Sequence, residues 1–299
     1  MNILITGATG FIGQALVSRL AGQHNLLLLT RDPLKAARLL PDPNCRFIDN
    51  LDSLSTLNDT DAIINLAGEP IIGKRWNPQQ KQRLCHSRWD ITETLAALIR
   101  RSETPPQVFI SASAVGFYGT WNTESLTESS TPKADFAHAI CARWESLALG
   151  AASEHTRVCI ARIGIVLGKQ GGALAKMLPA FKLGLGGPIG HGQQGMSWIH
   201  LDDLLSLLEF MLNSPTAKGI YNAVAPNPVS NREFAITLGK ALHRPAVLPA
   251  PAWMLSVLLG EQAMLLTQGQ YVLPTRAIEA GFNFRYPQLS QALAAIVQN

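Results

Sequence analysis

Short apolar runs alternate with segments of helical period through the first half of the chain. Continuous apolar runs of this kind are typical of strands buried on both faces, and apolar residues three or four apart indicate helices. The pattern predicts strands over 2–6, 26–30, 46–48, 62–68, 108–110 and 158–161, and helices over 14–20, 78–101 and 136–149. Such alternation predicts a doubly wound parallel sheet with its ligand at the carboxyl ends of the strands.

The hydrophobic pattern changes after Gly168. Glycines are frequent over 168–192 and predict a segment rich in loops. A helix over 201–212 follows, then a short strand over 220–223 and a helix that we expect Asn231 to cap. The tail from Pro249 carries two proline-delimited helical pieces. We therefore expect a larger α/β domain over 1–167. The range 168–299 should form mainly a smaller C-terminal substrate domain, with the chain returning to the sheet near 220–224.

Composition narrows the class of protein. The 299 residues are 47% hydrophobic and 15% charged, which favours a compact globule over disorder. The net charge is +4 and the isoelectric point is about 9.0, but no run of Lys or Arg concentrates that charge, so a nucleic-acid partner is not expected. Four widely spaced cysteines predict reduced thiols and no metal site.

The sequence also predicts a cytoplasmic protein without a membrane partner. The first strand begins at residue 2, where a signal peptide would stand, and the late apolar run over 253–266 is interrupted by Gly260 and Glu261. The expected partner is a small-molecule substrate that the sequence does not identify, and a homodimer is left open.

Three glycines spaced three apart, Gly7, Gly10 and Gly13, separate the first strand from the first helix. In a dinucleotide site the first glycine permits a tight turn, the second lets the backbone approach a pyrophosphate, and the third lets the helix pack on the sheet. The helix N-terminus then attracts the diphosphate, with Phe11 and Ile12 beside it. This placement favours dinucleotide binding on a Rossmann-like fold over a glycine-rich turn without a ligand.

The residue after the second strand indicates which dinucleotide. An acidic residue there would bind the 2′-hydroxyl of NAD. This chain has Arg31, whose guanidinium can pair with a 2′-phosphate, so NADP(H) is the expected cofactor, although a surface arginine is the alternative. The small residues that end the fourth strand, Leu66, Ala67 and Gly68, leave room for the cofactor across the strand end.

Several motifs taken together resemble the extended short-chain dehydrogenase/reductases, the NAD(P)-dependent epimerase/dehydratase superfamily. These are the glycine motif, Ser111-Ala112-Ser113 and Trp198-Ile199-His200-Leu201-Asp202-Asp203. The segments 65–71, 141–145 and 280–287 more closely resemble the YfcH-type epimerase-family proteins, and that resemblance runs from end to end. It implies a Rossmann domain, a small C-terminal substrate domain, and Ser111 beside the cofactor.

The family chemistry relies on a Tyr and a Lys four residues apart on one helix, with a Ser on the preceding strand end. Ser113 matches the family serine, whereas Ala137 and Cys141 stand at the Tyr and Lys positions, so the usual acid–base pair is absent. Tyr118 is the nearest phenol by sequence and is a candidate proton donor, with a loop or core tyrosine as the alternative. Arg88 could hold a cofactor phosphate or an anionic substrate, or lie on a solvated helix face.

The substrate side also departs from the sugar-nucleotide epimerases. Met196 stands where many of them have an arginine that binds the pyrophosphate, which leaves Lys169, Lys176 or Lys182 as candidate replacements. The seven histidines show no metal-ligand spacing, and His200 is expected to be structural.

These observations leave two candidate functions. One is an NADP(H)-dependent oxidoreductase or epimerase-like enzyme that uses Ser113 with Tyr118 or a water. The other is a non-catalytic NADP(H)-sensing regulator that binds a protein partner.

Overall fold

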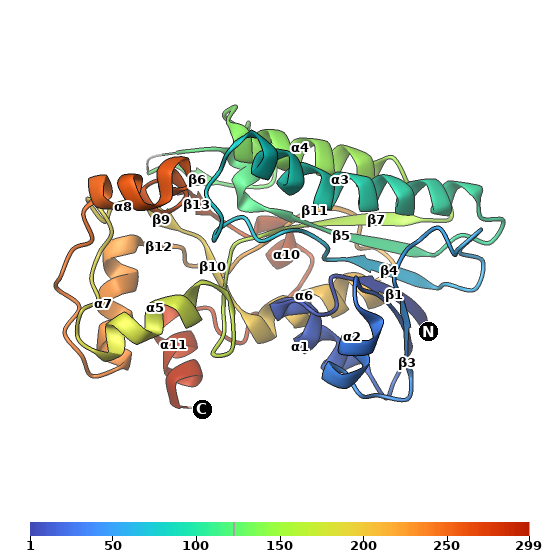
Figure 1. The fold of residues 1–299 in the computed structure, drawn as a ribbon, viewed down its shortest axis with the longest axis horizontal. Helices are drawn as coiled ribbons and strands as arrows, with labels where there is room; N and C mark the ends of the chain where they lie inside the picture. Colours follow the sequence, from blue (N-terminus) through green and yellow to red (C-terminus); the bar gives the residue numbers. More distant parts are fainter. Residues whose placement is uncertain (122, 299) are drawn as a thin grey trace.

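The computed structural model describes residues 1–121 and 123–298 and is built on a parallel sheet of seven strands (Figure 1). These strands are β1 (Asn2–Thr6), β2 (Asn25–Leu29), β3 (Cys45–Ile48), β4 (Ala62–Asn65), β5 (Val108–Ala114), β7 (Arg157–Ile163) and β11 (Gly219–Ala223). Their order is β11-β7-β5-β4-β1-β2-β3, so the winding reverses between β1 and β4. Ligands of such sheets bind at this reversal, beyond the carboxyl ends of the strands. The predicted Rossmann-like α/β fold is confirmed.

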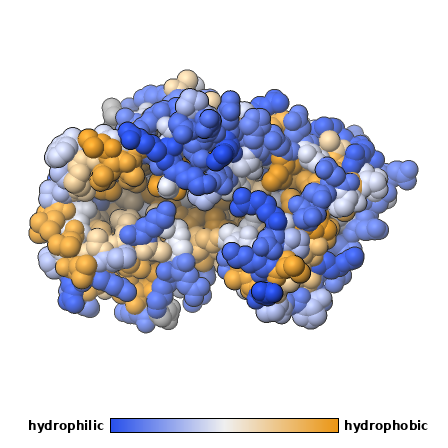
Figure 2. All heavy atoms as spheres, viewed as in Figure 1, coloured by the Kyte–Doolittle hydropathy of each residue, from blue (hydrophilic) through white to orange (hydrophobic). Residues whose placement is uncertain are grey.

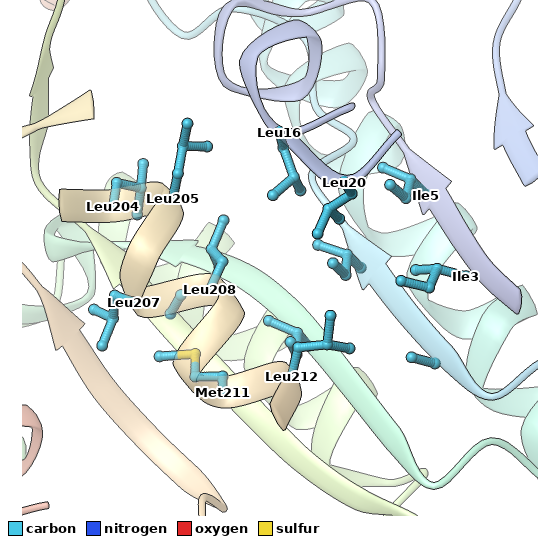
Figure 3. Close-up of a cluster of buried hydrophobic side chains, with 14 of the residues drawn as sticks. Ile3, Ile5, Leu16, Leu20, Leu204, Leu205, Leu207, Leu208, Met211 and Leu212 are labelled. Carbon is cyan, nitrogen blue, oxygen red and sulfur yellow. The ribbon is translucent and has the colours of Figure 1, made fainter. Parts of the chain in front are cut away.

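Helices cover both faces of the sheet. On one face lie α1 (Phe11–Leu20), α2 (Pro33–Leu39) and α6 (Leu201–Asn213), and on the other lie α3 (Pro78–Arg101) and α4 (Phe136–Leu149) (Figure 1). The alternation of β1 explains both layers, because Ile3 and Ile5 pack with α1 and α6 while Leu4 packs with α3. Figure 3 shows Leu204 and Leu208 of α6 in the same buried cluster as Ile3 and Ile5.

The rest of the chain forms a smaller part with its own core. Its elements are β8 (Ile165–Leu167), α5 (Gly172–Lys182), β9 (Gly195–Met196), β10 (Trp198–His200), β12 (Val229–Ser230), α7 (Asn231–Ala241), α8 (Ala252–Leu259), η2 (Gly260–Ala263), α9 (Met264–Thr267) and α11 (Leu289–Gln298). β8 pairs in parallel with β10, and β9 pairs antiparallel with β12. Trp198, Phe234 and Leu293 are fully buried at the centre of this core.

The C-terminal half of the chain contributes elements both to the large sheet and to the smaller part. β11 joins the large sheet beside β7, α6 packs on that sheet, and α10 (Thr275–Glu279) contacts β11. Short connecting elements, η1 (Val115–Tyr118), β6 (Ser125–Leu126) and β13 (Tyr271–Val272), lie between the parts, with β6 paired to β13. Residues after 168 therefore supply the smaller part and also complete the sheet and one of its helical layers.

Several local predictions differ from the structure: the strand predicted over 62–68 ends at Asn65, and the one predicted over 108–110 continues to Ala114. The first helix begins at Phe11 rather than at residue 14, because Gly10 already serves as its N-cap. Helix α7 is capped by Ser230, whose hydroxyl accepts from the Glu233 amide at 3.1 Å, and Asn231 is its first residue. The range 168–192 is not loop throughout, since α5 occupies eleven residues of it.

Helix α8 presents apolar side chains to solvent and buries none of its residues. Trp253, Val257 and Leu258 are all exposed, and Figure 2 shows hydrophobic residues gathered at this end of the molecule. Within residues 1–121 and 123–298, no helix has both the length and the apolar character needed to cross a bilayer.

Candidate functional site

The glycine turn after β1 is built so closely that side chains are excluded from two of its positions. Gly7 has a φ of +71°, and a Cβ there would lie 2.6 Å from the Leu66 carbonyl oxygen. A Cβ at Gly13 would lie 2.2 Å from the Gly7 carbonyl oxygen. This turn therefore requires glycine for backbone conformation at the first position and for close packing of α1 at the third.

The N-terminus of α1 is open to an anion. Its N-cap is Gly10, which has no side chain to bond the first-turn amides, and no acidic residue lies in that turn. These amides and the positive end of the helix dipole form a site of the kind that binds a diphosphate. The Ile12 side chain lines the adjoining cavity, whereas the Phe11 ring packs against Gly171 in the loop before α5.

A cavity of about 520 Å³ opens at the carboxyl ends of β4, β5 and β7, between the sheet and the smaller part. Figure 2 shows the hollow between the two parts, and most of the residues that line the cavity are apolar. The sheet and the residues that follow β4 contribute its floor through Leu66, Ala67, Gly68, Ala112, Ser113, Ala114 and Ile163. Of the predicted site residues, Ile12, Leu66, Ala67, Gly68, Arg88 and Ser113 line this cavity, and Ser111 lies just behind it, fully buried in β5.

A buried polar cluster fixes the end of β4, and the sequence analysis missed it. The Thr6 hydroxyl donates to Asn65 Oδ1 at 2.6 Å, and the Ala67 amide donates to Thr6 Oγ1 at 3.2 Å. Asn65 Nδ2 donates to Thr92 Oγ1 of α3 at 2.8 Å. These bonds join β1, β4 and α3 where the strand ends approach the glycine turn. The available signal was Asn65, the polar residue inside the otherwise apolar run 62–67.

Arg88 reaches from α3 to the cavity wall. Its Nη1 donates to the Leu84 carbonyl at 2.9 Å, and its Nη2 donates to the Glu69 carbonyl at 2.9 Å. The guanidinium lies 5.4 Å from the Trp144 ring, and its burial lowers the pKa of Arg88. Of the predicted alternatives, a solvated helix face is wrong for this side chain, because the guanidinium is bound to backbone and lines the cavity.

Arg31 follows β2 and is exposed, outside the cavity lining. It lies close enough to Glu69 to contribute to the lowered pKa of that carboxyl, whose main cause is Lys74 at 2.8 Å, with Arg83 a further contributor. Three cationic side chains therefore lie near Glu69, in the loop that follows β4. That loop is at the end of the sheet at which a Rossmann fold holds the adenosine ribose.

A chain of buried hydrogen bonds runs from the cavity wall into the core. Ser113 Oγ donates to Glu145 Oε1 at 2.6 Å, and Glu145 forms a two-point ion pair with Arg162 at 2.9 and 2.8 Å. Arg162 Nη1 donates to the Tyr118 hydroxyl at 2.9 Å, which donates to Asn222 Oδ1 at 2.7 Å. We call these five residues the Ser113–Asn222 network. It links β5, α4, β7, η1 and β11.

The Ser113–Asn222 network gives Tyr118 a setting unlike that of the predicted proton donor. Its side chain is 0% exposed and does not line the cavity, and burial raises the pKa of its phenol. Both of its hydrogen bonds are to protein groups. The structure therefore corresponds to the alternative, a core tyrosine.

Tyr118→Phe tests this assignment. The change leaves Arg162 Nη1 and Asn222 Oδ1 without their buried partner, so the free energy of unfolding should fall by about 1–3 kcal/mol. NADPH affinity, measured by calorimetry on the same preparation, should stay within about twofold of the parent, since a hydroxyl outside the cavity makes no cofactor contact. A large loss of affinity without loss of stability would restore the predicted site role.

Helix α4 turns one face toward the cavity, and this face lacks the family acid–base pair. Ala137, Cys141 and Trp144 line the cavity from successive turns. Burial and the nearby Glu145 carboxylate raise the pKa of the Cys141 thiol to about 11, so it remains a neutral thiol at physiological pH. His138 lies outside the lining, and its Nδ1 is 2.6 Å from the Phe117 carbonyl oxygen.

The three lysines predicted as replacements for the missing arginine do not line the cavity. Met196 lines the cavity, whereas Lys169, Lys176 and Lys182 are exposed and lie outside its lining. His200 caps α6, accepting from the Asp202 amide at 3.1 Å, which is a structural role. In the described part of the chain, no group of three His, Cys, Asp or Glu residues is placed to hold a metal ion.

Comparison with known proteins places this architecture. Residues 3–224 match the model of the NAD dependent epimerase/dehydratase family, and residues 250–296 match a domain of unknown function, DUF1731. The chain is 44% identical over 304 residues to the chloroplastic epimerase family protein SDR39U1 homolog of Arabidopsis thaliana, covering 100% of this chain and 87% of the relative. It is 38% identical to the human epimerase family protein SDR39U1, covering 99% of this chain and 100% of the relative.

The structural comparison agrees. The crystal structure of human epimerase family protein SDR39U1 (isoform 2) with NADPH superposes with a TM-score of 0.92 at 37% identity, covering 100% of both chains. The expected resemblance to an epimerase-family protein is thereby confirmed over the full length. The chain belongs to the NAD dependent epimerase/dehydratase family.

Proposed function

We propose that this protein is an NADP(H)-dependent oxidoreductase or epimerase-like enzyme that acts on a small substrate. The observation that carries the proposal is the intact glycine turn and uncapped α1 terminus, whose Ile12 lines a cavity with Ser113 in its wall. The NADPH bound by the human relative supports the same cofactor here. NADPH, when bound, supplies a hydride to the substrate.

The chain's own residues divide the binding work. The amides of the α1 first turn, with Gly7, Gly10 and Gly13 beneath them, would hold the diphosphate. Arg31 would pair with the 2′-phosphate, in an environment that Lys74 and Arg83 make more cationic. Residues 66–68 would receive the rest of the dinucleotide where it crosses the end of β4.

Proton exchange is assigned to Ser113 rather than to Tyr118. In the oxidising direction, Ser113 Oγ takes the proton of the substrate hydroxyl and passes its own proton to Glu145 Oε1, 2.6 Å away. In the reducing direction the same protons move back, to the substrate oxygen by way of Ser113. Arg162 holds the Glu145 carboxylate in place through two bonds, so the acceptor is fixed before the substrate arrives.

Ser113→Ala is the test of this proposal. NADPH oxidation with a panel of carbonyl compounds, followed by absorbance, should fall by about tenfold or more, because general acid–base contributions are of this size or larger. NADPH affinity should be unchanged. Tyr118→Phe is the control that should keep turnover. Equal turnover in the parent and Ser113→Ala proteins would contradict the role of Ser113.

Arg31→Ala tests the choice of cofactor. Loss of a charge-assisted bond to the 2′-phosphate should weaken NADPH binding by about tenfold, while NADH binding, which has no such bond, should change by less than about twofold. Calorimetric titration with each dinucleotide gives both values. Equal losses for NADPH and NADH would remove the 2′-phosphate assignment.

A non-catalytic NADP(H)-sensing regulator is the second candidate. The observation that favours it is the α4 face, where Ala137 cannot exchange a proton and the Cys141 thiol is neutral. A regulator of this kind would bind a protein partner differently with and without NADPH. Affinity capture from cell extract, run in parallel with and without NADPH and followed by direct binding to the captured protein, separates this function from turnover.

A further inference from the structure

The cavity beyond the cofactor side has almost no charge. Among the described residues that line it, the charged side chains are Arg88 and Asp135. Both are engaged: Arg88 donates to backbone carbonyls of Leu84 and Glu69, and Asp135 Oδ1 accepts from the His138 amide at 2.7 Å as the cap of α4. A substrate diphosphate placed in this cavity would lose its hydration and would have Arg88 as its one cationic partner among the described lining residues, which leaves most of its charge uncompensated.

Among the described residues, the walls contributed by the smaller part and by the loop after β4 carry no charged side chain: they combine apolar residues with the neutral polar side chains of Gln194, Ser197, Asn231, Gln268 and Gln270. Met177 of α5, Met264 of α9, and Ile71 and Trp76 from the loop line the cavity. Long, flexible methionines and a broad aromatic surface suit a ligand with a large apolar portion. The charged groups of a nucleotide have no counterpart on these walls.

Two of the lining residues each carry a buried polar atom that has no hydrogen-bond partner among the described residues. They are the indole Nε1 of Trp144 and the amide Oε1 of Gln194, and both side chains are only 5% exposed. Gln194 Nε2 donates to the Ile189 and Leu266 carbonyls at 3.0 and 2.9 Å, which fixes the amide and its free oxygen. Buried polar atoms are rarely left unsatisfied, so a free donor and a free acceptor in one cavity point to a ligand.

We propose that the substrate is an uncharged, mainly apolar carbonyl or alcohol compound, which the Trp144 N–H recognises as a donor and Gln194 Oε1 recognises as an acceptor. This proposal rests on the proposed function, because it names the substrate class of the same NADP(H) site. A ketone can accept from Trp144 and cannot donate to Gln194. The corresponding alcohol can do both when it binds, and its one O–H then turns from Gln194 Oε1 to Ser113 Oγ for the proton transfer of the proposed function. A nucleoside-diphosphate sugar is disfavoured, because Arg88 is the one cation among the described lining residues that could offset its diphosphate.

The test uses three probes of one shape, 4-phenylcyclohexanone, 4-phenylcyclohexanol and phenylcyclohexane, with UDP-glucose as the charged competitor. Binding to the NADPH-saturated protein is measured by calorimetry, after the NADPH affinity itself has been measured. The ketone should bind at least about fivefold more tightly than the hydrocarbon, as expected for one added hydrogen bond, and the alcohol should bind at least about fivefold more tightly than the ketone because it makes a second. UDP-glucose should neither bind nor displace the ketone.

Two substitutions assign the polar atoms. Trp144→Phe should remove the preference for ketone over hydrocarbon, and Gln194→Met should reduce the preference for alcohol over ketone, with NADPH affinity unchanged in both. Trp253→Phe and Gln107→Met, at exposed positions away from the cavity, are the matched controls and should keep both preferences.

The outcomes separate this inference from the proposed function. Tighter binding of UDP-glucose than of the ketone overturns the substrate class, and so does failure of all three neutral probes to bind a protein that still binds NADPH. Equal affinities for ketone, alcohol and hydrocarbon overturn the roles of Trp144 and Gln194. Failure to bind NADPH would instead remove the proposed function.

Discussion

Gly10→Ala is expected to weaken NADPH binding by at least about 100-fold while the protein still folds. The backbone at Gly10 has a φ of −77°, which any residue adopts, and a Cβ there would meet one atom within 4 Å, the Gly7 carbonyl oxygen at 3.2 Å. The cost to the fold is therefore small. The methyl group would stand at the mouth of the α1 terminus, where the diphosphate must approach the backbone.

The size of the effect follows from the bonds that would be lost. A hydrogen bond to a charged group contributes about 1.5–3 kcal/mol, so losing two of them to the diphosphate corresponds to a loss of affinity of 100-fold or more. Calorimetric titration with NADPH gives the affinity, and denaturant unfolding without cofactor gives the stability.

Two other glycines serve as controls. Gly13→Ala should destabilise the fold directly, because its Cβ would lie 2.2 Å from the Gly7 carbonyl oxygen. Gly150→Ala at the end of α4 should change neither property, since its φ is −64° and its Cβ would make contacts of 3.4 Å or longer. NADPH affinity within about threefold of the parent in Gly10→Ala would show that the diphosphate does not approach this turn.

The sequence was sufficient to predict the strands of the sheet and the glycine turn of the cofactor site, because both depend on patterns among neighbouring residues. Apolar runs located the strands, and the glycine spacing located the turn that joins β1 to α1. Helices α2 and α5, which were not predicted, had weaker signals in the sequence. Helix α2 is only seven residues long, although Asp32 and Pro33 were a start signal, and α5 contains Pro179 and lies among glycines.

The Ser113–Asn222 network could not be predicted, because its members come from five elements and meet only in the folded chain. Arg162 had one local signal, a charged residue within the apolar run from Val158 to Ile163, but nothing in the sequence indicated its partner. The same limit explains Tyr118. Sequence distance from Ser113 suggested a shared site, whereas η1 turns the phenol into the core toward Arg162.

Arg162→Met is expected to lower the free energy of unfolding by about 3–5 kcal/mol, the largest stability change predicted for this chain. Arg162 and Glu145 are 2% and 4% exposed, so removing the guanidinium leaves the Glu145 carboxylate buried with only the Ser113 hydroxyl as a partner. Arg19→Met, which breaks the part-exposed pair with Glu209 at 2.8 Å, is the matched control and should cost no more than about 1 kcal/mol.

The double substitution Glu145→Leu with Arg162→Met distinguishes a buried charge from lost packing. If the uncompensated carboxylate causes the loss, removing it as well should recover more than half of the stability, because apolar replacement of a buried ion pair is often neutral or favourable. Denaturant unfolding of the parent, the two single variants and the double variant gives the coupling between the two sites. Equal instability of the double variant and Arg162→Met would show instead that the guanidinium acts through its packing on the Phe117 ring, 3.4 Å away.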